Sequence, residues 1–317
     1  MMNNVQFPKI TIITAAYNAE EYIAETIKSV QSQIYDNWEY IIADNGSTDK
    51  TADIIKTFLN DKRIKYLYVP QKGKAIARNN AFAISKGTYI ANIDSDDLWL
   101  EDKLLKQVKL IESDNNIVLV YTGVVLFNQL NNSEKIKIPV DISKNSNPLK
   151  YLLTVGNPIT HSSVLFRRSS FSSNHYQYED IEKVDEQIIY WKALLSSNKV
   201  GFIPDVLTKY RVHNESEFEN IPINEFCQYY KKGIDTFFNL PKIPSEIVRV
   251  KKKAYGAMYY SSGTVGLTQN KSIMLSIKYL IYSILLRPNK THYAIMTLVR
   301  YLYKETVLNL KLISGQK

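Results

Sequence analysis

Residues 73–99 read GKAIARNNAFAISKGTYIANIDSDDLW, and this stretch decides the fold class. Apolar residues recur at helical spacing over Ala75–Lys86, and the strand-like run Thr88–Asp94 follows after a single glycine. A helix that leads directly into an apolar strand is typical of a parallel βαβ unit. The strand leads into Asp94–Asp97 (DSDD), so carboxylates stand where the strand ends.

The same alternation of strands and helices extends to both sides of this stretch. Predicted strands cover Lys9–Ala15, Trp38–Asp44 and Ile64–Val69, and predicted helices cover Glu20–Ser32, the segment of Ile54, Ile55, Phe58 and Leu59, and Lys103–Ile111. This order predicts an α/β protein with a Rossmann-like, mostly parallel sheet and helices on both faces.

After residue 115 the alternation becomes irregular. We expect a strand or hairpin over Ile117–Phe127, a polar loop over Gln129–Pro148, strands at Val164–Phe166 and Val200–Ile203, and a helix over Glu186–Leu195. From about residue 223 the pattern is helical, and Ser272–Leu286 is apolar on nearly every face. Three regions are therefore predicted: 1–115, 116–222 and 223–317.

Composition narrows the class of protein. The 317 residues are 45% hydrophobic and 22% charged, which is typical of a globular chain. The single cysteine, Cys227, excludes a disulfide scaffold or a cysteine-rich metal site and fits a reducing compartment. We expect no secretory signal and no membrane-spanning helix, because neither pattern occurs.

The positive charge is confined to the last third of the chain. The formal net charge is +9, yet residues 225–317 hold fifteen Lys and Arg against four Asp and Glu, and residues 1–224 hold 25 against 27. Such asymmetry indicates a surface-binding segment. Nucleic acid is not the expected partner, because no helix-turn-helix, zinc-finger or RNP pattern accompanies the charge.

Polar residues follow three of the predicted parallel strands. Tyr17-Asn18, Asp44–Ser47 and Asp94–Asp97 stand at carboxyl ends, where ligands bind in open parallel sheets. Clustered carboxylates suit Mg²⁺ or Mn²⁺ shared with substrate phosphates. The alternative is that DSDD is an ordinary turn and helix cap.

Taken together, four segments resemble glycosyltransferase family 2, the inverting enzymes with the GT-A fold. They are residues 10–33 (ITIITAAYNAEEYIAETIKSVQSQ), 38–51 (WEYIIADNGSTDKT), 73–99 and 201–213 (GFIPDVLTKYRVH). The overall pattern is similar to bacterial enzymes that build capsule, O-antigen or teichuronic-type polysaccharide. The resemblance implies metal-dependent transfer of a sugar from a nucleotide donor, UDP-linked, to a saccharide or polyprenyl-linked acceptor. Residues 1–115 would bind the nucleotide sugar and residues 116–222 the acceptor.

The resemblance also implies roles on the donor side. Tyr17 would lie against the base, Asp44 would accept its imide N–H, and Arg78 would sit near the diphosphate. Asp94 and Asp96 form the DxD element with Ser95 between them: Asp96 would ligate Mn²⁺ or Mg²⁺, and Asp94 would bind ribose or the shell of the metal. Ala15 stands where the family often has Thr, so one possible base contact is missing. Asn45 replaces a second Asp, and a short polar residue can still cap that turn. The alternatives are that Tyr17 is a core residue and Arg78 a helix-surface cation.

On the acceptor side the resemblance implies a general base. Alignment on Trp191 places Glu186-Gln187 where the family has Glu-Asp, so the usual base position is Gln187, which cannot accept a proton at neutral pH. We predict Glu186 or, second, Asp185 as the base, and Glu179-Asp180 as a displaced alternative. These acids could also simply stabilise the N-terminus of a helix.

Tyr210–His213 matches the family's YRxH element. Arg211 and His213 would close over the diphosphate, and His213 would also ligate the metal. His161 and Trp191 are predicted on the acceptor side.

Two readings of the basic C-terminal region stay open. Arg249, Lys251–Lys253 and Ser272–Leu286 suit peripheral attachment to the cytoplasmic face of the plasma membrane. Alternatively, they form a solvated basic face and a helix buried against protein.

Two rival functions complete the predictions. A sugar-phosphate nucleotidyltransferase would need a glycine-rich segment after its first strand, and AAYNAEE is not one. A non-catalytic nucleotide-sugar-binding partner is suggested by Gln187.

Overall fold

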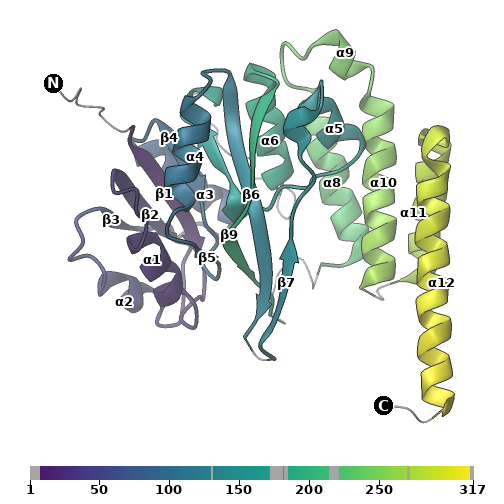
Figure 1. The fold of residues 1–317 in the computed structure, drawn as a ribbon, viewed down its shortest axis with the longest axis horizontal. Helices are drawn as coiled ribbons and strands as arrows, with labels where there is room; N and C mark the ends of the chain where they lie inside the picture. Colours follow the sequence, from purple (N-terminus) through teal and green to yellow (C-terminus); the bar gives the residue numbers. More distant parts are fainter. Residues whose placement is uncertain are drawn as a thin grey trace. The chain divides into compact units, whose positions relative to one another are not determined.

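The computed structural model describes residues 8–129, 131–171, 181, 185–213, 221–269 and 272–314 (Figure 1). The chain forms two compact units, one of residues 1–149 and 158–214 and one of residues 150–157 and 215–317. The short segment 150–157, inside the predicted acceptor region, therefore belongs with the C-terminal unit.

The first unit begins with the predicted strands and helices. In chain order they are β1 (Ile10–Ala16), α1 (Ile23–Gln31), β2 (Trp38–Asp44), α2 (Thr51–Lys56), β3 (Ile64–Tyr68), α3 (Lys74–Ile84), β4 (Tyr89–Asn92), β5 (Leu98–Trp99) and α4 (Lys103–Glu112). Every element predicted before residue 115 is present, and the two-residue strand β5 is an addition that its length kept from prediction.

The remaining elements of this unit depart further from the predictions. They are β6 (Ile117–Asn128), β7 (Ser133–Lys137), α5 (Pro148–Thr154, which runs into the second unit), β8 (Leu165–Arg167), α6 (Asp185–Ser196) and β9 (Lys199–Arg211), with short 3₁₀ turns at Ile142–Lys144 (η1), His161–Ser163 (η2) and Arg168–Ser170 (η3). The predicted polar loop contains β7, whose side chains are all exposed. A strand with no buried face carries no apolar alternation from which to predict it.

The strands form one sheet in the order β3-β2-β1-β4-β8-β6-β9-β5, with β7 paired to β6. Strands β1 to β4 pair in parallel, as predicted. Beyond β4 the sheet is mixed, because β8 runs antiparallel to both β4 and β6, whereas β6 and β9 are parallel. The predicted parallel pairing is thus confirmed for β1 to β4. It is wrong beyond β4, where the short strand β8 runs antiparallel between β4 and β6.

Both faces of the parallel half are covered. All seven residues of β2 are buried, and successive strand residues point to opposite faces, so neither face meets water. On one face Ile12 and Ile42 pack in a cluster with Ile27 of α1 and Val108 of α4. Helix α3 contacts β1 and β2. This rigid half fixes the ends of β1, β2 and β4.

The second unit is helical, as predicted. It contains α8 (Ile223–Phe238), α9 (Ser245–Val248), α10 (Lys251–Thr268), α11 (Ile273–Leu286), a 3₁₀ turn η4 (Pro288–Lys290) and α12 (Thr291–Ser314). Leu267, Leu280 and Ala294, from three different helices, form a small core. No helix within the described ranges is long and apolar enough to span a membrane.

Candidate active site

The parallel pairing of β1, β2 and β4 brings their carboxyl ends to one edge of the sheet. Ala16 of β1 is in register with Asp44 of β2, and Ile13 of β1 with Asn92 of β4. The segments that follow these strands therefore lie at a common edge, where an open α/β sheet binds its ligands.

The loop after β1 is fastened to the loop after β2. Asn18 adopts a positive φ of 47°, which asparagine tolerates, and its Oδ1 accepts the Thr48 N–H at 2.9 Å. In return the Asn18 N–H donates to Ser47 Oγ at 3.1 Å. The preceding residue, Tyr17, has a side chain that is 51% exposed, so the alternative of a core tyrosine is wrong. An exposed ring at this edge is free to stack on a planar group.

Asp44 is built into the turn that follows β2. It is 1% exposed; its Oδ1 accepts the Ser47 N–H at 2.9 Å and its Oδ2 accepts the Tyr66 hydroxyl at 2.7 Å. Ala15 is partly buried in the neighbouring strand. The predicted contacts of Asp44 and Ala15 with a nucleotide base stay predictions.

Asn45 has a structural function that the sequence did not reveal. Its Oδ1 accepts the Gly73 N–H at 2.8 Å, while its Nδ2 donates to the carbonyl oxygens of Val69 (3.3 Å) and Gln71 (2.5 Å). Only an amide both donates and accepts in this way, so an aspartate here could not make all three bonds. Asn45 thereby joins the turn after β2 to the start of α3.

A cluster of alternating charges lies beyond β4. Arg78 of α3 is 4% exposed in its side chain; its Nη2 lies 2.6 Å from Asp94 Oδ1 and its Nη1 lies 3.7 Å from Glu186 Oε1 of α6. Lys74 Nζ is 3.9 Å from the same Glu186 oxygen. The alternative of Arg78 as a helix-surface cation is therefore wrong. Two carboxylates and two cations balance one another here.

His161 completes this cluster. Ligand atoms of Asp94, His161 and Glu186 all lie within 4.8 Å of one another. His161 is 3% exposed, its Nδ1 lies 3.3 Å from the Tyr190 hydroxyl, and its Nε2 is buried with no hydrogen-bond partner among the described residues. Burial, aided by Arg78, holds the pKa of His161 well below its usual value, so the imidazole is neutral.

Opposing effects act on the pKa of the Asp94 carboxyl. Burial raises the pKa of the Asp94 carboxyl and nearby Glu186 raises it further, while Arg78 opposes both effects. Arg78 is thus the main group that favours the ionised form of Asp94. Asp94 is also fixed through its backbone, because its N–H donates to Ser162 Oγ at 3.0 Å.

Asp96 pairs with His213 beside this cluster. Asp96 Oδ2 lies 2.8 Å from His213 Nε2, and the two side chains are 26% and 16% exposed. A carboxylate oxygen and an imidazole nitrogen at this distance, both reachable from solvent, fit a divalent cation such as Mn²⁺. The Asp94–His161–Glu186 group fits one less well, because Arg78 and Lys74 already neutralise its two carboxylates.

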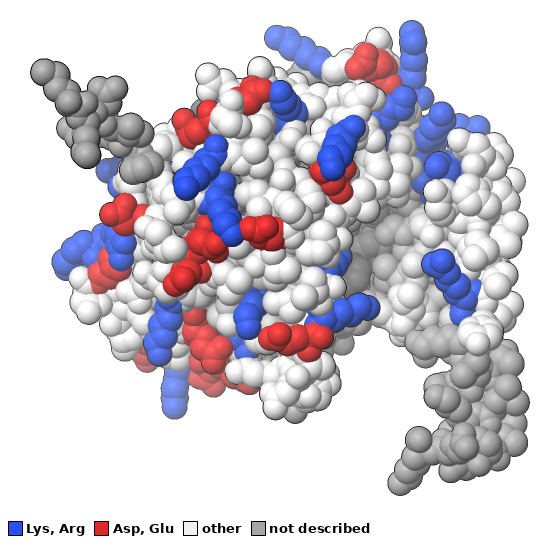
Figure 2. All heavy atoms as spheres, viewed as in Figure 1, with Lys and Arg blue, Asp and Glu red and all other residues white. Residues whose placement is uncertain are grey.

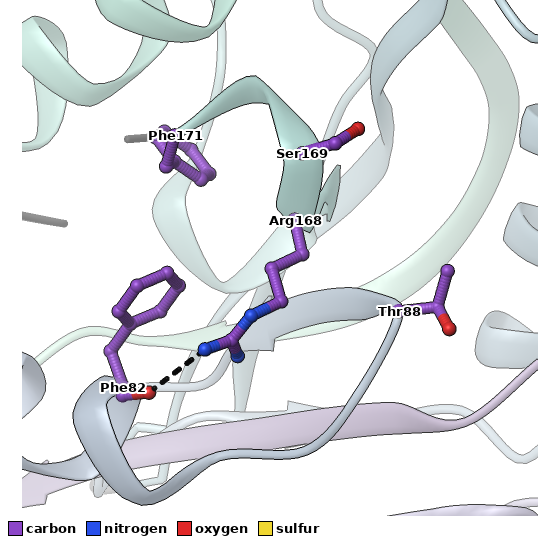
Figure 3. Close-up of a pocket in the computed structure, with 5 residues that line it drawn as sticks. All are labelled: Phe82, Thr88, Arg168, Ser169 and Phe171. Carbon is purple, nitrogen blue, oxygen red and sulfur yellow. Dashed lines mark hydrogen bonds between the residues drawn. The ribbon is translucent and has the colours of Figure 1, made fainter. Parts of the chain in front are cut away.

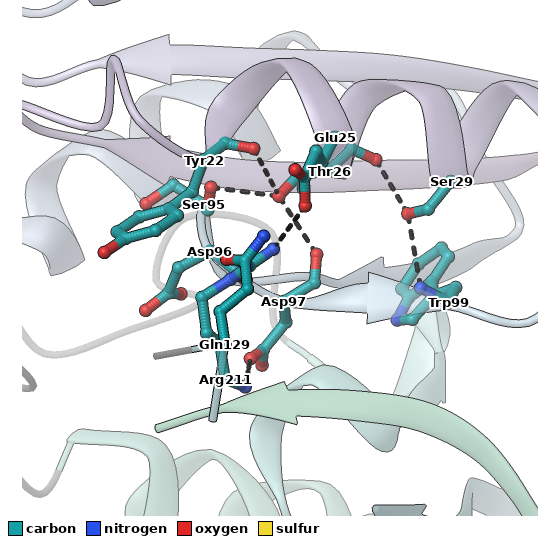
Figure 4. A network of polar contacts seen from close by, with 10 residues as sticks. All are labelled: Tyr22, Glu25, Thr26, Ser29, Ser95, Asp96, Asp97, Trp99, Gln129 and Arg211. Carbon is teal, nitrogen blue, oxygen red and sulfur yellow. Dashed lines mark hydrogen bonds and ion pairs between the residues drawn. The ribbon is translucent and has the colours of Figure 1, made fainter. Parts of the chain in front are cut away.

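Asp97 and Arg211 join β9 to the segment that contains Asp96 (Figure 4). Asp97 is 1% exposed and accepts the Ser162 hydroxyl and, at 2.9 Å, the Arg211 N–H. The Arg211 side chain is also buried; it donates to the Asp96 carbonyl at 2.8 Å and pairs with Glu25 at 2.7 Å. Arg211 is a cross-link in this structure, and its predicted closure over a diphosphate stays a prediction. In the sequence Asp97 is only the last residue of Asp94–Asp97, and no local pattern indicates these contacts.

The other predicted residues fall around this cluster or inside the fold. Ser95 is partly buried, and its carbonyl accepts the Thr26 hydroxyl at 2.9 Å. Trp191 is 1% exposed and is a core residue of α6, so its acceptor contact stays a prediction. The side chain of Asp185 and the whole of Glu179-Asp180 lie outside the described residues.

A separate pocket lies at the amino-terminal end of β4, away from the end that leads into Asp94 (Figure 3). It is lined by Phe82, Thr88, Arg168, Ser169 and Phe171. Thr88 precedes β4, whereas Asp94 follows it, so the pocket lies away from the carboxylates. Arg168 stacks 4.3 Å from the Phe82 ring and donates to the Phe82 carbonyl at 3.4 Å, which makes this pocket a packing feature.

Comparison with known proteins agrees with this arrangement. Residues 11–173 match the sequence model described as "Glycosyl transferase family 2". The Escherichia coli glucosyltransferase WfgD is 33% identical over 214 residues, 67% of this chain and 80% of WfgD. The putative teichuronic acid biosynthesis glycosyltransferase TuaG of Bacillus subtilis is 40% identical over 124 residues, 38% of this chain and 49% of TuaG. The chain spans half or less of the length of the first curated relatives that it matches.

The fold has close counterparts among solved structures. The crystal structure of residues 1–349 of S. aureus TarS in complex with UDP-GlcNAc superposes with a TM-score of 0.66 at 18% identity, covering 97% of this chain and 92% of that one. This likeness confirms the GT-A fold. Fold, family model and relatives agree, and the chain belongs to glycosyltransferase family 2.

Proposed function

We propose that the chain transfers a sugar from a UDP-linked donor, with inversion, to a saccharide or lipid-linked acceptor of a bacterial surface polysaccharide. Two relatives support this proposal through their names. WfgD is named for UDP-Glc and a GlcNAc-diphosphoundecaprenol acceptor, and TuaG for teichuronic acid biosynthesis. TarS, with the same fold, binds UDP-GlcNAc.

The observation that carries the proposal is the position of Glu186 beside Asp94 and Arg78. Its carboxylate is 30% exposed at the carboxyl edge of the sheet, so solvent and an acceptor hydroxyl both have access to it. As general base, Glu186 would take the proton of that hydroxyl while the oxygen bonds to the anomeric carbon. The bond from that carbon to the diphosphate breaks in the same step, and UDP leaves with the electron pair. Arg78 would stabilise the departing charge.

A divalent cation would be held by Asp96 and His213. When bound, Mn²⁺ or Mg²⁺ supplies Lewis-acid stabilisation of the leaving diphosphate. Asp97 and Arg211 would keep the two ligands in position, and Tyr17 would stack on the base.

Release of UDP from a panel of UDP-sugars tests this proposal. We expect slow release from one sugar with Mn²⁺, none with EDTA, and none from Asp96→Ala. Asp53→Ala is the matched control, because Asp53 is an exposed aspartate of α2 and should leave release unchanged. If wild type binds no UDP with Mn²⁺ present, the assignment of the donor is wrong.

A non-catalytic nucleotide-sugar-binding protein is the competing proposal. It is favoured by Gln187, whose Oε1 is buried with no hydrogen-bond partner among the described residues and which cannot act as a base. This alternative predicts UDP binding without turnover of any UDP-sugar.

A further inference from the structure

Helix α11 carries large apolar side chains on its outer face as well as on its inner face. Its buried positions are Ser276, Tyr279, Leu280 and Ser283, whereas Met274, Ile281 and Leu285 are 86%, 50% and 67% exposed. A helix on the surface of a water-soluble protein normally turns polar residues toward the solvent.

The inner face of α11 packs closely on glycines of α10. A Cβ atom added at Gly263 would meet Leu280 Cγ at 2.7 Å and the Ser276 carbonyl oxygen at 2.9 Å. One added at Gly266 would meet Ile223 Cδ1 of α8 at 2.1 Å and Ser276 Oγ at 2.2 Å. Small residues that let two helices approach, with large apolar residues turned outward, are the pattern of helices that face lipid.

Helix α12 extends this apolar surface. Of the twenty-two exposed large hydrophobic side chains in the described structure, twelve lie on α11 and α12. Val299, Leu302 and Tyr303 of α12 are 51%, 61% and 72% exposed, while Ala294 is buried against Leu280. A patch of this kind marks an interaction surface.

The charge around these helices identifies the partner. Between Glu246 and Glu305 the sequence contains ten Lys and Arg and no Asp or Glu. In the space-filling view the described part of α12 is white and blue (Figure 2). Lys278 of α11 lies 5.8 Å above the Tyr282 ring, so a cation stands directly beside the apolar residues. Exposed apolar side chains next to cations such as Lys278 match an anionic lipid surface. A second copy of the same face would bring like charges together.

We propose that the outer faces of α11 and α12 dock on an anionic lipid bilayer. The 14-residue α11 is too short to cross a bilayer and would lie in the interfacial plane, with Ile277 and Ile281 in the acyl region. The proposal rests on the proposed function in one respect, because it would place the enzyme at the surface that holds a lipid-linked acceptor.

Co-sedimentation of the full chain with vesicles tests the proposal. We expect at least tenfold stronger partitioning into vesicles with about 30% phosphatidylglycerol than into pure phosphatidylcholine, with the excess lost at high salt. Ile277→Asp with Ile281→Asp should reduce partitioning at least tenfold, and Lys278→Glu with Arg300→Glu at least threefold. Ile136→Asp is the control, because Ile136 is 66% exposed on β7 of the other unit and should change partitioning less than twofold.

Three results would overturn the proposal. They are the absence of vesicle binding at low salt, binding that Ile277→Asp with Ile281→Asp leaves unchanged, and an oligomer in sedimentation velocity that this variant dissociates while vesicles capture nothing. UDP release without vesicles, measured on the same samples, separates this proposal from the proposed function. The α11 variants should release UDP as fast as wild type does. If wild type itself releases no UDP, only the enzymatic assignment is contradicted.

Discussion

Replacing Arg78 by alanine should expose the repulsion that its guanidinium suppresses. The carboxylates of Asp94 and Glu186 approach within 4.8 Å, and at that distance two like charges repel by about 3 kcal/mol if the effective dielectric constant is about 20. Removing one partner of a buried ion pair costs about 3–5 kcal/mol. Because the Asp94 and Glu186 side chains are 31% and 30% exposed, we expect the lower end of this range, a loss of about 3 kcal/mol in unfolding free energy.

Urea unfolding at pH 7, followed by tryptophan fluorescence, measures this loss. All three tryptophans, Trp38, Trp99 and Trp191, lie in the unit that contains the cluster, so the signal reports on the right part of the chain. Lys56→Ala is the control, because Lys56 and Asp53 are 53% and 83% exposed and their pair should contribute no more than about 0.5 kcal/mol.

The pH dependence of Arg78→Ala should have a defined sign. Without Arg78 the pKa of Asp94 rises further in the folded protein, because Arg78 is the main charge that opposes its rise. The folded state then binds an extra proton, and the deficit shrinks as the pH falls towards 5. A loss below about 1 kcal/mol, or the same loss in an Asp94→Asn background, would refute the reasoning, because the cost must depend on the partner charge.

Three further predictions test the site and the fold. Glu186→Gln should lower UDP release about 10²–10⁴-fold with unchanged UDP affinity, whereas Glu101→Gln, at an exposed glutamate, should do nothing; retained release would transfer the base to Asp185. Because the pKa of His161 is lowered in the folded state, the unfolded chain binds a proton more readily below pH 6.5, so wild type should lose about 1.4 kcal/mol per pH unit there relative to His161→Gln. If the unfolding free energies of wild type and His161→Gln instead change with pH in parallel, His161 is not held neutral. Gly87→Ala should cost about 3 kcal/mol, because the new Cβ would lie 2.3 Å from the Thr11 nitrogen and 2.7 Å from the Tyr89 carbonyl oxygen; a melting temperature within about 2 °C of wild type would contradict this.

The sequence by itself determined the parallel half of the fold. Runs of apolar and aromatic residues such as those in Trp38–Asp44 are buried on both faces, so their apolar content is high enough to predict a strand. The helices between them have a regular apolar period. It also placed Tyr17, Asp44 and Asp94 at one edge, because consecutive parallel strands carry their ends to the same side.

The mixed half of the sheet and the acceptor side needed the tertiary structure. The position of β8 between β4 and β6 depends on contacts between strands far apart in sequence, and β7 has no buried face to give it a pattern. The partners of Arg78 illustrate the same limit. Asp94 is 16 residues away and Glu186 more than a hundred, so no local spacing could show that one buried guanidinium serves both.

The roles of Asp97 and α11 were likewise decided only by folding. Asp97 is a turn residue in the sequence, and burial made it the anchor of Ser162 and Arg211. Ser272–Leu286 was apolar on nearly every face, so its sequence could not say which side faces protein. The packing on α10 decided that, because the side of α11 that carries Ser276 and Leu280 lies against Gly263 and Gly266, which leaves Met274, Ile277, Ile281 and Leu285 outside.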